Sequence, residues 1–499
     1  MRQTFDVAVI GGGPAGTTAA RCLARFGYRV CLLQRAGSRG RDVPHLETLS
    51  PGAIELIRYH HPETWPRIAE NLVSCSNSGG WSHDDTDLFD TRPASLVDRR
   101  KLDSLLSQSA AEAGVRFQEI GRTTAKPRFH GDWILTANED DAALCRSRFL
   151  IDAAGRYSAS PANRLPSFAR TLAFGGRCTG LTLPLQSTHV EALTDGWLWA
   201  ARLHGSDAYV NLFVSPPVAR GWAGGERHTG FVQLLRQSSL VSDNCSPRLV
   251  SDLVAREATP IERFPLVGER LLRVGDAAFA LDPLSSQGVQ HALSSAGQAA
   301  IVIHTILARP ENTNWAKAFF RERHHEMIDR HRASCAALYS RQNRFETPFW
   351  QERKRLASAV LSPTPSKDKG TFGRAGLDDL LRVPLILSPE ARWCDTPVIA
   401  GDFVELRPAL CHPSLPRPIA FLGNQYLCEL FAQFFPLMTG IALLHRWITN
   451  ARMLPAVAAL ALESLVRKGV LVPVQFQYSN FVHGPEGPTP SPRPFAGSQ

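Results

Sequence analysis

The stretch "VAVIGGGPAGTTAARCLARFGYRVCLLQR", residues 7–35, decides the fold of the first part of the chain. A short apolar run leads into glycines at G-x-G-x-x-G spacing, then into apolar residues at helical spacing and a second apolar run. This order predicts a strand, a tight turn and a helix whose first N–H groups bind a pyrophosphate. The residues expected to contact the pyrophosphate are Gly11, Gly13, Pro14, Ala15 and Gly16.

The end of the second predicted strand leaves the identity of the dinucleotide open. The fingerprint has an acidic residue there that binds the ribose hydroxyls. This chain has Gln34, followed by Arg35. An amide still accepts a hydrogen bond from a hydroxyl, whereas an arginine suits the 2′-phosphate of NADP. We expect both side chains to lie near the nucleotide.

A second motif far downstream favours FAD. Residues 274–293 read "VGDAAFALDPLSSQGVQHAL", an apolar strand that ends in Gly-Asp before a loop and a long helix. This segment resembles the second nucleotide motif of FAD-dependent aromatic hydroxylases, in which the Asp binds a ribityl hydroxyl. The resemblance implies cofactor contacts from Gly275, Asp276, Pro283, Gln287 and Gly288.

Two further segments lie between these motifs in the family's order. "VDRRKLDSLL" (97–106) resembles the R-x-x-x-D segment that precedes a helix, which implies that Arg99 lies near the flavin. "FLIDAAGRYS" (149–158) resembles the strand that returns to the nucleotide domain. We therefore expect an α/β fold with FAD as cofactor. Its core is a Rossmann-like FAD-binding domain of the glutathione reductase/aromatic hydroxylase type.

Composition bounds the remaining possibilities. The chain has 499 residues, a net charge of +9 and an ordinary balance of 44% hydrophobic and 20% charged residues. Its ten cysteines include no C-x-x-C pair, so neither a disulfide framework nor a metal site is expected. The histidines at 324, 325 and 331 fit a solvated helix face. The apolar region 427–447 is interrupted by polar residues and is a poor membrane span. These features predict a cytoplasmic protein.

The organisation along the chain is discontinuous. Alternating apolar residues such as "AYVNLFV" (208–214) predict an inserted β-sheet substrate domain. The end of the chain has helix–turn–helix and strand patterns typical of a winged helix. The expected parts are an FAD-binding domain at 1–58, 90–160 and 262–345, a substrate domain at 59–89 and 161–261, a linker region at 346–373, a winged-helix-like domain at 374–482 and a disordered tail at 483–499.

The inserted domain carries Trp197 and Trp199 in "GWLWAARL". This resembles the W-x-W-x-I-P segment of flavin-dependent tryptophan halogenases and makes both residues candidates for the substrate pocket. Core packing explains two tryptophans at strand spacing equally well. Halogenases also need a lysine after the first glycine motif, and no lysine lies between His45 and Arg92. The sequence therefore favours transfer of oxygen over transfer of halogen.

Hydroxylation of an electron-rich ring needs a group that removes a proton as the ring rearomatises. Glu47, in the loop "HLETLSPG", and Asp282, beside the flavin motif, are the candidate bases. A purely structural role is the alternative for each residue: Asp282 precedes a proline and is typical of a turn, and Glu47 can fix the conformation of its loop.

The second glycine motif together with "YSRQNRFETPFWQERK" (339–354) resembles flavoproteins that mature quinone-cofactor enzymes. One group of these flavoproteins matures lysine and glycine oxidases, and another comprises the tryptophan hydroxylases of tryptophylquinone biogenesis. The resemblance implies a tryptophan side chain of a precursor polypeptide as substrate. It also implies dioxygen as co-substrate and NAD(P)H or a flavin reductase as electron source. A hydroxylase or halogenase of a small aromatic metabolite remains an alternative, as does a flavin-sensing DNA-binding regulator, although the second helix of the winged-helix pattern has few basic residues.

Overall fold

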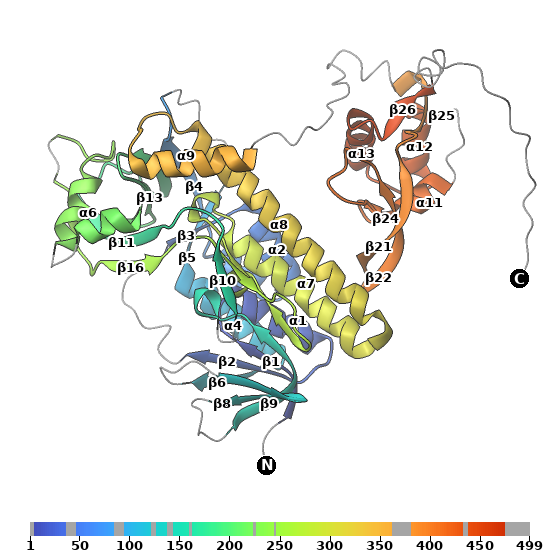
Figure 1. Cartoon of the computed structure of the whole chain (residues 1–499), viewed down its shortest axis with the longest axis horizontal. Coiled ribbons are helices and arrows are strands. Elements are labelled where there is room, and N and C mark those ends of the chain that lie inside the picture. Colours follow the sequence, from blue (N-terminus) through green and yellow to red (C-terminus); the bar gives the residue numbers. More distant parts are fainter. Residues whose placement is uncertain are drawn as a thin grey trace, which may run out of the picture. The chain divides into compact units, whose positions relative to one another are not determined.

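The computed structural model describes residues 4–35, 46–83, 94–120, 126–136, 143–158, 162–222, 226–243, 246–361, 381–432 and 438–474. Two units emerge from the contacts: residues 1–364 with 399–404, and residues 365–398 with 405–499. Figure 1 shows the elements of both units along the chain. The predicted tail at 483–499 lies outside the described residues.

The first glycine motif lies in a parallel sheet with the order β6-β2-β1-β9, extended by β18 on β9 and by the antiparallel β8 and β7. The run Val7–Ile10 is fully buried: Val7 and Val9 pack under helices on one face, whereas Ala8 and Ile10 pack on the other face with side chains of neighbouring strands. This confirms the predicted Rossmann-like domain. Its strands are β1 (Thr4–Ile10), β2 (Val30–Arg35), β6 (Arg116–Ile120), β7 (Lys126–His130), β8 (Asp132–Thr136), β9 (Ala143–Asp152) and β18 (Leu271–Arg273); its helices are α1 (Pro14–Arg25), α4 (Arg99–Glu112), α7 (Gly288–Ala308) and α8 (Thr313–Arg341).

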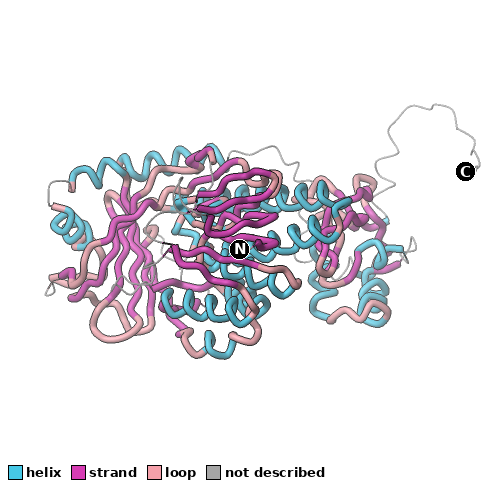
Figure 2. The backbone as a smooth tube through the Cα atoms, turned by 90° about the horizontal axis from the view of Figure 1, so that it is seen from below, coloured by secondary structure: helices cyan, strands magenta, loops and turns pink. Residues whose placement is uncertain are grey.

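A second, larger sheet has the order β15-β11-β14-β13-β12-β4-β5-β3, with β16 also paired to β11. Figure 2 shows the strands of the two sheets as separate groups. This confirms the predicted sheet-rich substrate domain. Its strands are β3 (Leu46–Leu49), β4 (Val73–Gly80), β5 (Ala94–Asp98), β11 (Leu172–Thr179), β12 (Ser187–Leu193), β13 (Gly196–Arg202), β14 (Ala208–Val214), β15 (Arg248–Leu249) and β16 (Val254–Glu257).

Side chains alternate across the larger sheet, so its two faces differ. Leu198 and Leu212 pack on one face with helices α5 (Pro216–Gly221) and α6 (Arg227–Leu235). Trp197 and Phe213, which are cross-strand partners, lie on the other face. A small third sheet of β10 (Asn163–Pro166), β17 (Ile261–Phe264) and β19 (Phe279–Ala280) completes the unit.

Two of the predicted boundaries are wrong. β3 and β5 lie in segments predicted for the FAD-binding domain, but β3 pairs with β5 and β5 pairs with β4, so both belong to the substrate sheet. Residues 348–361, expected within a linker, form helix α9, whose Trp350 is fully buried and donates a hydrogen bond to the carbonyl of Leu193 at 2.8 Å. The proline-rich composition that predicted a linker belongs to residues 362–373, which lie outside the described part of the chain.

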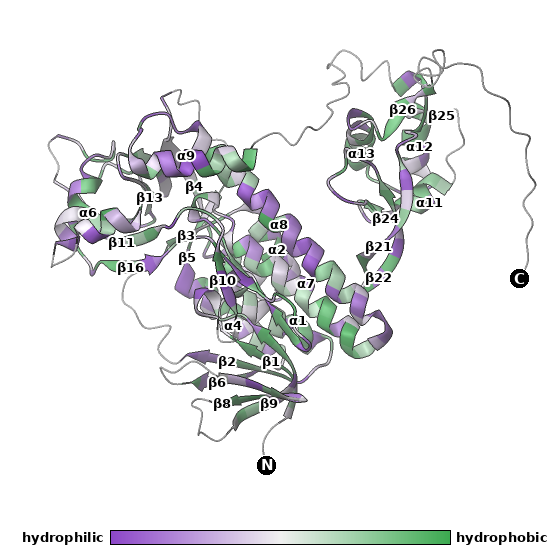
Figure 3. Ribbon diagram, viewed as in Figure 1, coloured by the Kyte–Doolittle hydropathy of each residue, from purple (hydrophilic) through white to green (hydrophobic). Residues whose placement is uncertain are grey.

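Helices α7 and α8 differ in hydropathy: α8 carries hydrophilic residues along its length, as Figure 3 shows, whereas α7 is largely apolar. α7 is long and apolar enough to cross a membrane by composition, but much of it is buried against α1 and the parallel sheet. The prediction that the histidines of α8 form a solvated face is wrong for His324 and His331, which are buried, and holds for the exposed His325. Among the described residues no histidine, cysteine or carboxylate cluster suits a metal ion.

The second unit contains a three-stranded sheet in the order β25-β20-β26 with a pair of helices. The helices α12 and α13 followed by β26 match the order that predicted a winged helix. Cys394 and Cys411 form a disulfide between β21 and β22, which the sequence analysis did not expect. The elements are β20 (Pro384–Leu387), β21 (Arg392–Ala400), β22 (Phe403–Cys411), β23 (Phe421–Leu422), β24 (Gln425–Tyr426), α11 (Leu427–Ala432), β25 (Met438–Thr439), α12 (Gly440–Thr449), α13 (Pro455–Arg467) and β26 (Leu471–Pro473).

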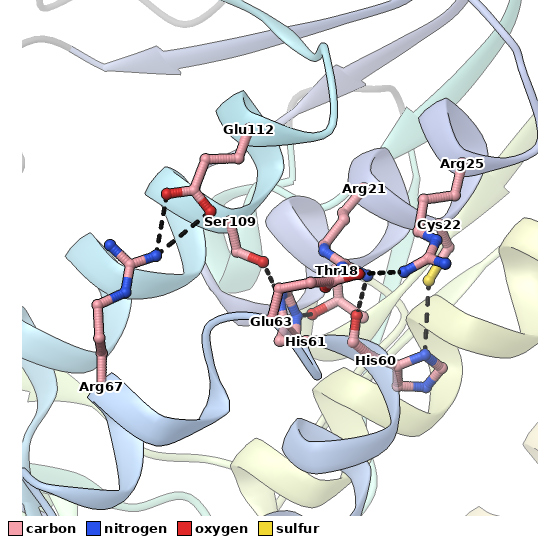
Figure 4. A network of polar contacts seen from close by, with 10 residues as sticks. All are labelled: Thr18, Arg21, Cys22, Arg25, His60, His61, Glu63, Arg67, Ser109 and Glu112. Atoms are coloured by element: carbon pink, nitrogen blue, oxygen red, sulfur yellow. Dashed lines mark hydrogen bonds and ion pairs between the residues drawn. The ribbon is translucent and has the colours of Figure 1, made fainter.

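A buried polar network joins α1 and α4 to the connection between α2 (Pro51–His60) and α3 (Trp65–Ala69) (Figure 4). The His61 ring lies between the hydroxyls of Thr18 and Ser109, with an N–O distance of 2.9 Å to each. Arg21 donates to the His60 carbonyl and to the carboxylate of Glu63. These bonds fix the helices that cover the parallel sheet.

Candidate active site

A cavity of about 670 Å³ is lined by residues of both the parallel sheet and the substrate sheet. This volume lies in the range typical of cofactor and substrate sites. The predicted site residues in its wall are Gly13, Pro14, Ala15, Arg35, Glu47, Arg99, Trp197, Trp199, Asp276, Asp282, Pro283 and Gly288.

The first glycine turn fits a pyrophosphate. Gly11 has a φ of +113°, and a Cβ there would lie 2.2 Å from the Ala153 carbonyl oxygen. A Cβ on Gly16 would lie 1.8 Å from the carbonyl oxygen of Gly11, whereas a Cβ on Gly13 would meet no atom within 4 Å. Gly11 and Gly16 therefore allow the turn to close, and Gly13 faces the open cavity. Helix α1 has neither a side-chain cap nor an acidic residue in its first turn, so its N–H groups are available to an anion.

The second glycine turn lies directly against the first. Gly275 has a φ of +56°, and a Cβ there would lie 2.9 Å from the Ala15 side chain. Asp276 follows in the cavity wall, with its carboxylate 3.6 Å from the Arg156 guanidinium. Packing thus brings together two motifs that are separated by more than 250 residues in the sequence.

Arg99 is held by two carboxylates at the start of α4. Its Nη1 lies 2.8 Å from Glu47 Oε2, and its Nε lies 2.8 Å from Asp103 Oδ1. Burial acts to lower the pKa of Arg99, but Asp103 and Glu47 together raise it above its usual value. A fixed positive charge therefore lies in the cavity wall, and the pairing holds Glu47 in place on β3.

Asp282 is buried and caps the short 3₁₀ helix Pro283–Ser285 through the backbone N–H of Leu284 at 3.0 Å. Its other carboxylate oxygen accepts a hydrogen bond from the Tyr339 hydroxyl at 3.0 Å. Burial raises the pKa of Asp282 above its usual value, and these hydrogen bonds together with the nearby Arg353 and Arg156 offset part of that rise. The carboxylate therefore caps the short helix and also lines the cavity, and its role as a base stays a prediction.

An aromatic wall faces the two glycine turns from the substrate sheet. Trp197 is almost fully buried and stacks on Phe213 with ring centroids 3.8 Å apart, whereas Trp199 is half-buried. Both line the cavity, and Trp197 also packs in the core, while a role in a substrate pocket stays a prediction for each. Asn211, the cross-strand partner of Trp199, adds an amide to this wall.

Five predicted cofactor residues lie outside the cavity wall. Gly11, Gly16 and Gly275 shape the two turns, and Gln287 immediately precedes α7. Gln34 is buried behind the first turn, where a Cβ on Gly12 would lie 2.6 Å from its Oε1. Arg35, not Gln34, lies in the wall, so contact between Gln34 and a ribose stays a prediction.

Three polar residues that no sequence motif predicts also line the cavity: Asn211, Arg256 and Glu257. A signal for Asn211 was present in "AYVNLFV", where a polar residue interrupts an apolar strand on the face that carries Tyr209 and Phe213. Nothing local marks Arg256 and Glu257, because their position depends on how β16 pairs with β11.

Comparison with known proteins identifies the family. The family described as tryptophan halogenase matches residues 81–362, more than half of the chain. The chain belongs to the tryptophan halogenase family. A second match, to the pyridine nucleotide-disulphide oxidoreductase family, covers residues 5–64 and with them the first glycine turn.

Relatives of this tryptophan halogenase family member include both halogenases and hydroxylases. Tryptophan 2-halogenase of Chondromyces crocatus is 26% identical over 423 residues, covering 76% of this chain and 77% of that protein. The solved structure of the peptidyl tryptophan dihydroxylase QhpG, described as essential for tryptophylquinone cofactor biogenesis, has a TM-score of 0.63 at 22% identity and covers 94% of this chain and 100% of QhpG. The flavin-dependent halogenase CmlS has a TM-score of 0.70 at 19% identity and covers 95% of this chain and 97% of CmlS.

Family membership and the two glycine turns together make the chain a flavin-dependent oxidoreductase whose cofactor is FAD. The first turn and the N-terminus of α1 suit the pyrophosphate, and Asp276 and Gly288, the first residue of α7, lie in the same cavity wall. The predictions of the family, the cofactor and an enzymatic activity are thereby confirmed.

Proposed function

We propose that the chain is an FAD-dependent monooxygenase that hydroxylates a tryptophan side chain of a precursor polypeptide in tryptophylquinone biogenesis. The observation that supports oxygen transfer most directly is the composition of the cavity wall, which contains no lysine among the described residues. Tryptophan halogenation depends on a lysine beside the ring, and residues 46–91 also contain none.

The polypeptide substrate is supported by the similarity to QhpG, whose description is that of a peptidyl tryptophan dihydroxylase. That similarity extends over the second unit as well as the flavin-binding part. In α13 the side chains of Val457 and Leu460 are exposed, and its one basic residue, Arg467, pairs with Glu463 at 2.6 Å. Such a helix suits contact with a polypeptide better than contact with DNA, which argues against the regulator.

Bound FAD supplies activation of dioxygen once it is reduced by NAD(P)H or by a separate flavin reductase. The protein holds the substrate ring against the wall formed by Trp197, Trp199 and Phe213 and excludes water there. The Asn211 amide can bind the indole N–H. Asp282 is the proposed acceptor of the ring proton, because the other candidate, Glu47, is engaged in an ion pair with Arg99. We place the protein in the cytoplasm.

Mass spectrometry tests the proposal. FAD-loaded protein is given a reductant, dioxygen and either a tryptophan-bearing precursor polypeptide or free tryptophan, with a polypeptide carrying Phe in place of the tryptophan as control. The expected result is a gain of one or two oxygen atoms on the tryptophan-bearing polypeptide alone. Oxygen gained by free tryptophan and not by the polypeptide would contradict the peptide substrate.

Halogenation of a small aromatic compound is the second candidate, and the tryptophan 2-halogenase relative favours it. The same assay separates the two when chloride or bromide is added to a halide-free buffer. A product whose mass changes with the halide supplied would establish halogenation and overturn the monooxygenase.

A further inference from the structure

Strand β16 is both an edge of the substrate sheet and part of the cavity wall. Ala255 to Ala258 all line the cavity, so the cavity reaches this edge. Within the described ranges, β16 pairs with β11 on one side and with no strand on the other. An edge strand of this kind presents unpaired N–H and C=O groups to another extended chain.

The direction of these groups follows from the register. The N–H of Ala258 donates to the carbonyl of Thr171 at 2.9 Å. Phe174 pairs with Ala255 and Leu172 with Glu257 in the same antiparallel ladder. Since bonded and non-bonded pairs alternate in such a ladder, the backbone groups of Ala255 and Glu257 point away from β11. No backbone group of the described residues bonds to them.

We propose that β16 binds the polypeptide substrate by strand addition. An extended segment next to the reacting tryptophan pairs with the backbone of Ala255 and Glu257, and this pairing leaves the tryptophan ring in the cavity. The inference rests on the proposed function and adds to it the means by which a polypeptide is distinguished from a free metabolite, since only a polypeptide offers a main chain to the edge.

Two features favour this occupant over a second copy of the chain. The edge is continuous with the cavity that takes the reacting ring, so a chain added at the usual spacing of about 4.8 Å lies at the cavity border. Ala255 is small and exposed, so its side chain does not obstruct that approach.

Proline substitution removes the outward N–H without disturbing the pairing to β11. Proline is tolerated on edge strands where the N–H faces solvent, so Ala255→Pro should fold and bind FAD normally. The matched control is Arg164→Pro in β10. The N–H of Arg164 also points away from its partner strand, because Ser167 N–H bonds to the Pro260 carbonyl in that ladder, and β10 does not line the cavity.

The measurement is the affinity of the FAD-loaded protein for a fluorescently labelled, tryptophan-bearing precursor polypeptide, by fluorescence anisotropy. Ala255→Pro is expected to weaken binding about five- to tenfold, the effect of losing one main-chain hydrogen bond at a binding edge, while Arg164→Pro leaves it unchanged. N-methylation of the polypeptide backbone beside the tryptophan should weaken binding to the wild type at alternate positions only, because alternate N–H groups face the edge.

Equal affinity of wild type and Ala255→Pro, or equal effects of N-methylation at every position, would overturn strand addition while leaving the proposed function intact if the polypeptide is still oxidised. A change in the sedimentation of the free protein caused by Ala255→Pro, without a change in polypeptide affinity, would assign the edge to self-association and also overturn it. A wild type that oxidises no tryptophan in the polypeptide would overturn the proposed function and this inference with it.

Discussion

Glu47 and Arg99, more than fifty residues apart in the sequence, form an ion pair in the cavity wall, with Nη1 2.8 Å from Oε2. The pair joins the substrate sheet, through β3, to the first residue of α4 in the FAD-binding part. The Glu47 carboxylate is thereby fixed on Arg99, and Asp282 is the candidate left for the proton acceptor. The pair also places a fixed charge at the junction of the two parts.

Removal of that charge is predicted to weaken FAD binding. In Arg99→Ala, Glu47 and Asp103 lose their common partner, and the cavity wall keeps the Glu47 carboxylate without the positive charge that would face an anionic cofactor. We expect the Kd for FAD to rise about tenfold or more, since a hydrogen-bonded charge contributes roughly 1.5–3 kcal/mol. Flavin fluorescence titration measures it. The matched control is Arg67→Ala, which breaks the exposed Arg67–Glu112 pair and should leave the Kd unchanged.

The two glycines of the first turn are predicted to respond differently to alanine. Gly13→Ala places a methyl group in the open cavity, so the protein should fold with an unchanged unfolding temperature and bind FAD about tenfold or more weakly. Gly16→Ala forces a Cβ against the Gly11 carbonyl and should lower the unfolding temperature of the FAD-free protein. Thermal unfolding with and without FAD checks both. Normal FAD affinity in Gly13→Ala would show that the pyrophosphate does not lie over this turn.

The role of Asp282 is tested through its hydrogen-bond partner. The Tyr339 hydroxyl lowers the pKa of Asp282, against the larger effect of burial, which raises it. Tyr339→Phe should therefore raise that pKa and shift the acid limb of the pH–rate profile to higher pH. Asp282→Asn should retain FAD and lose most of the oxygenation rate, by about a hundredfold. A fall in rate without a shift of the acid limb in Tyr339→Phe would assign Asp282 a purely structural role.

Buried neutral histidines predict that the fold is sensitive to acid. Burial and the nearby charge of Arg21 lower the pKa of His61 to about 3 in the folded state. The unfolded state therefore binds more protons between pH 6.5 and 3, and the free energy of unfolding falls as the pH is lowered through this window.

His61→Gln, which can still bond to Thr18 and Ser109, should flatten the dependence of the unfolding temperature on pH between 7.5 and 5. His228→Gln, a change of an exposed histidine on α6, is the control and should leave the dependence as in the wild type. Parallel pH curves for His61→Gln and the wild type would exclude His61 as a source of the acid sensitivity.

Local patterns predicted the parts of the molecule that depend on backbone chemistry over short spacings. Gly11, Gly13 and Gly16 marked a strand–turn–helix unit, and Gly275 with Asp276 marked the second turn. Such motifs are readable because the glycines recur at a fixed short spacing around a tight turn, even though Gly11 packs against Ala153 and Gly275 against Ala15, which are distant in the sequence. The predicted domain boundaries were wrong where the local composition of a segment did not indicate the sheet or core in which that segment packs. Trp350, on helix α9, is buried in the same cluster as Trp197 and Phe213, a long-range contact that a window of nearby residues cannot reveal.

The sequence by itself determined the dinucleotide fold, the FAD motifs and the absence of a lysine where halogenation needs one, since these are properties of residues close together in the chain. Only the tertiary structure decided that Arg99 engages Glu47, that Asp282 is tied to Tyr339 and that β16 forms an open edge at the cavity. Those relationships depend on strand register and on burial, which arise when distant segments pack together and exclude water.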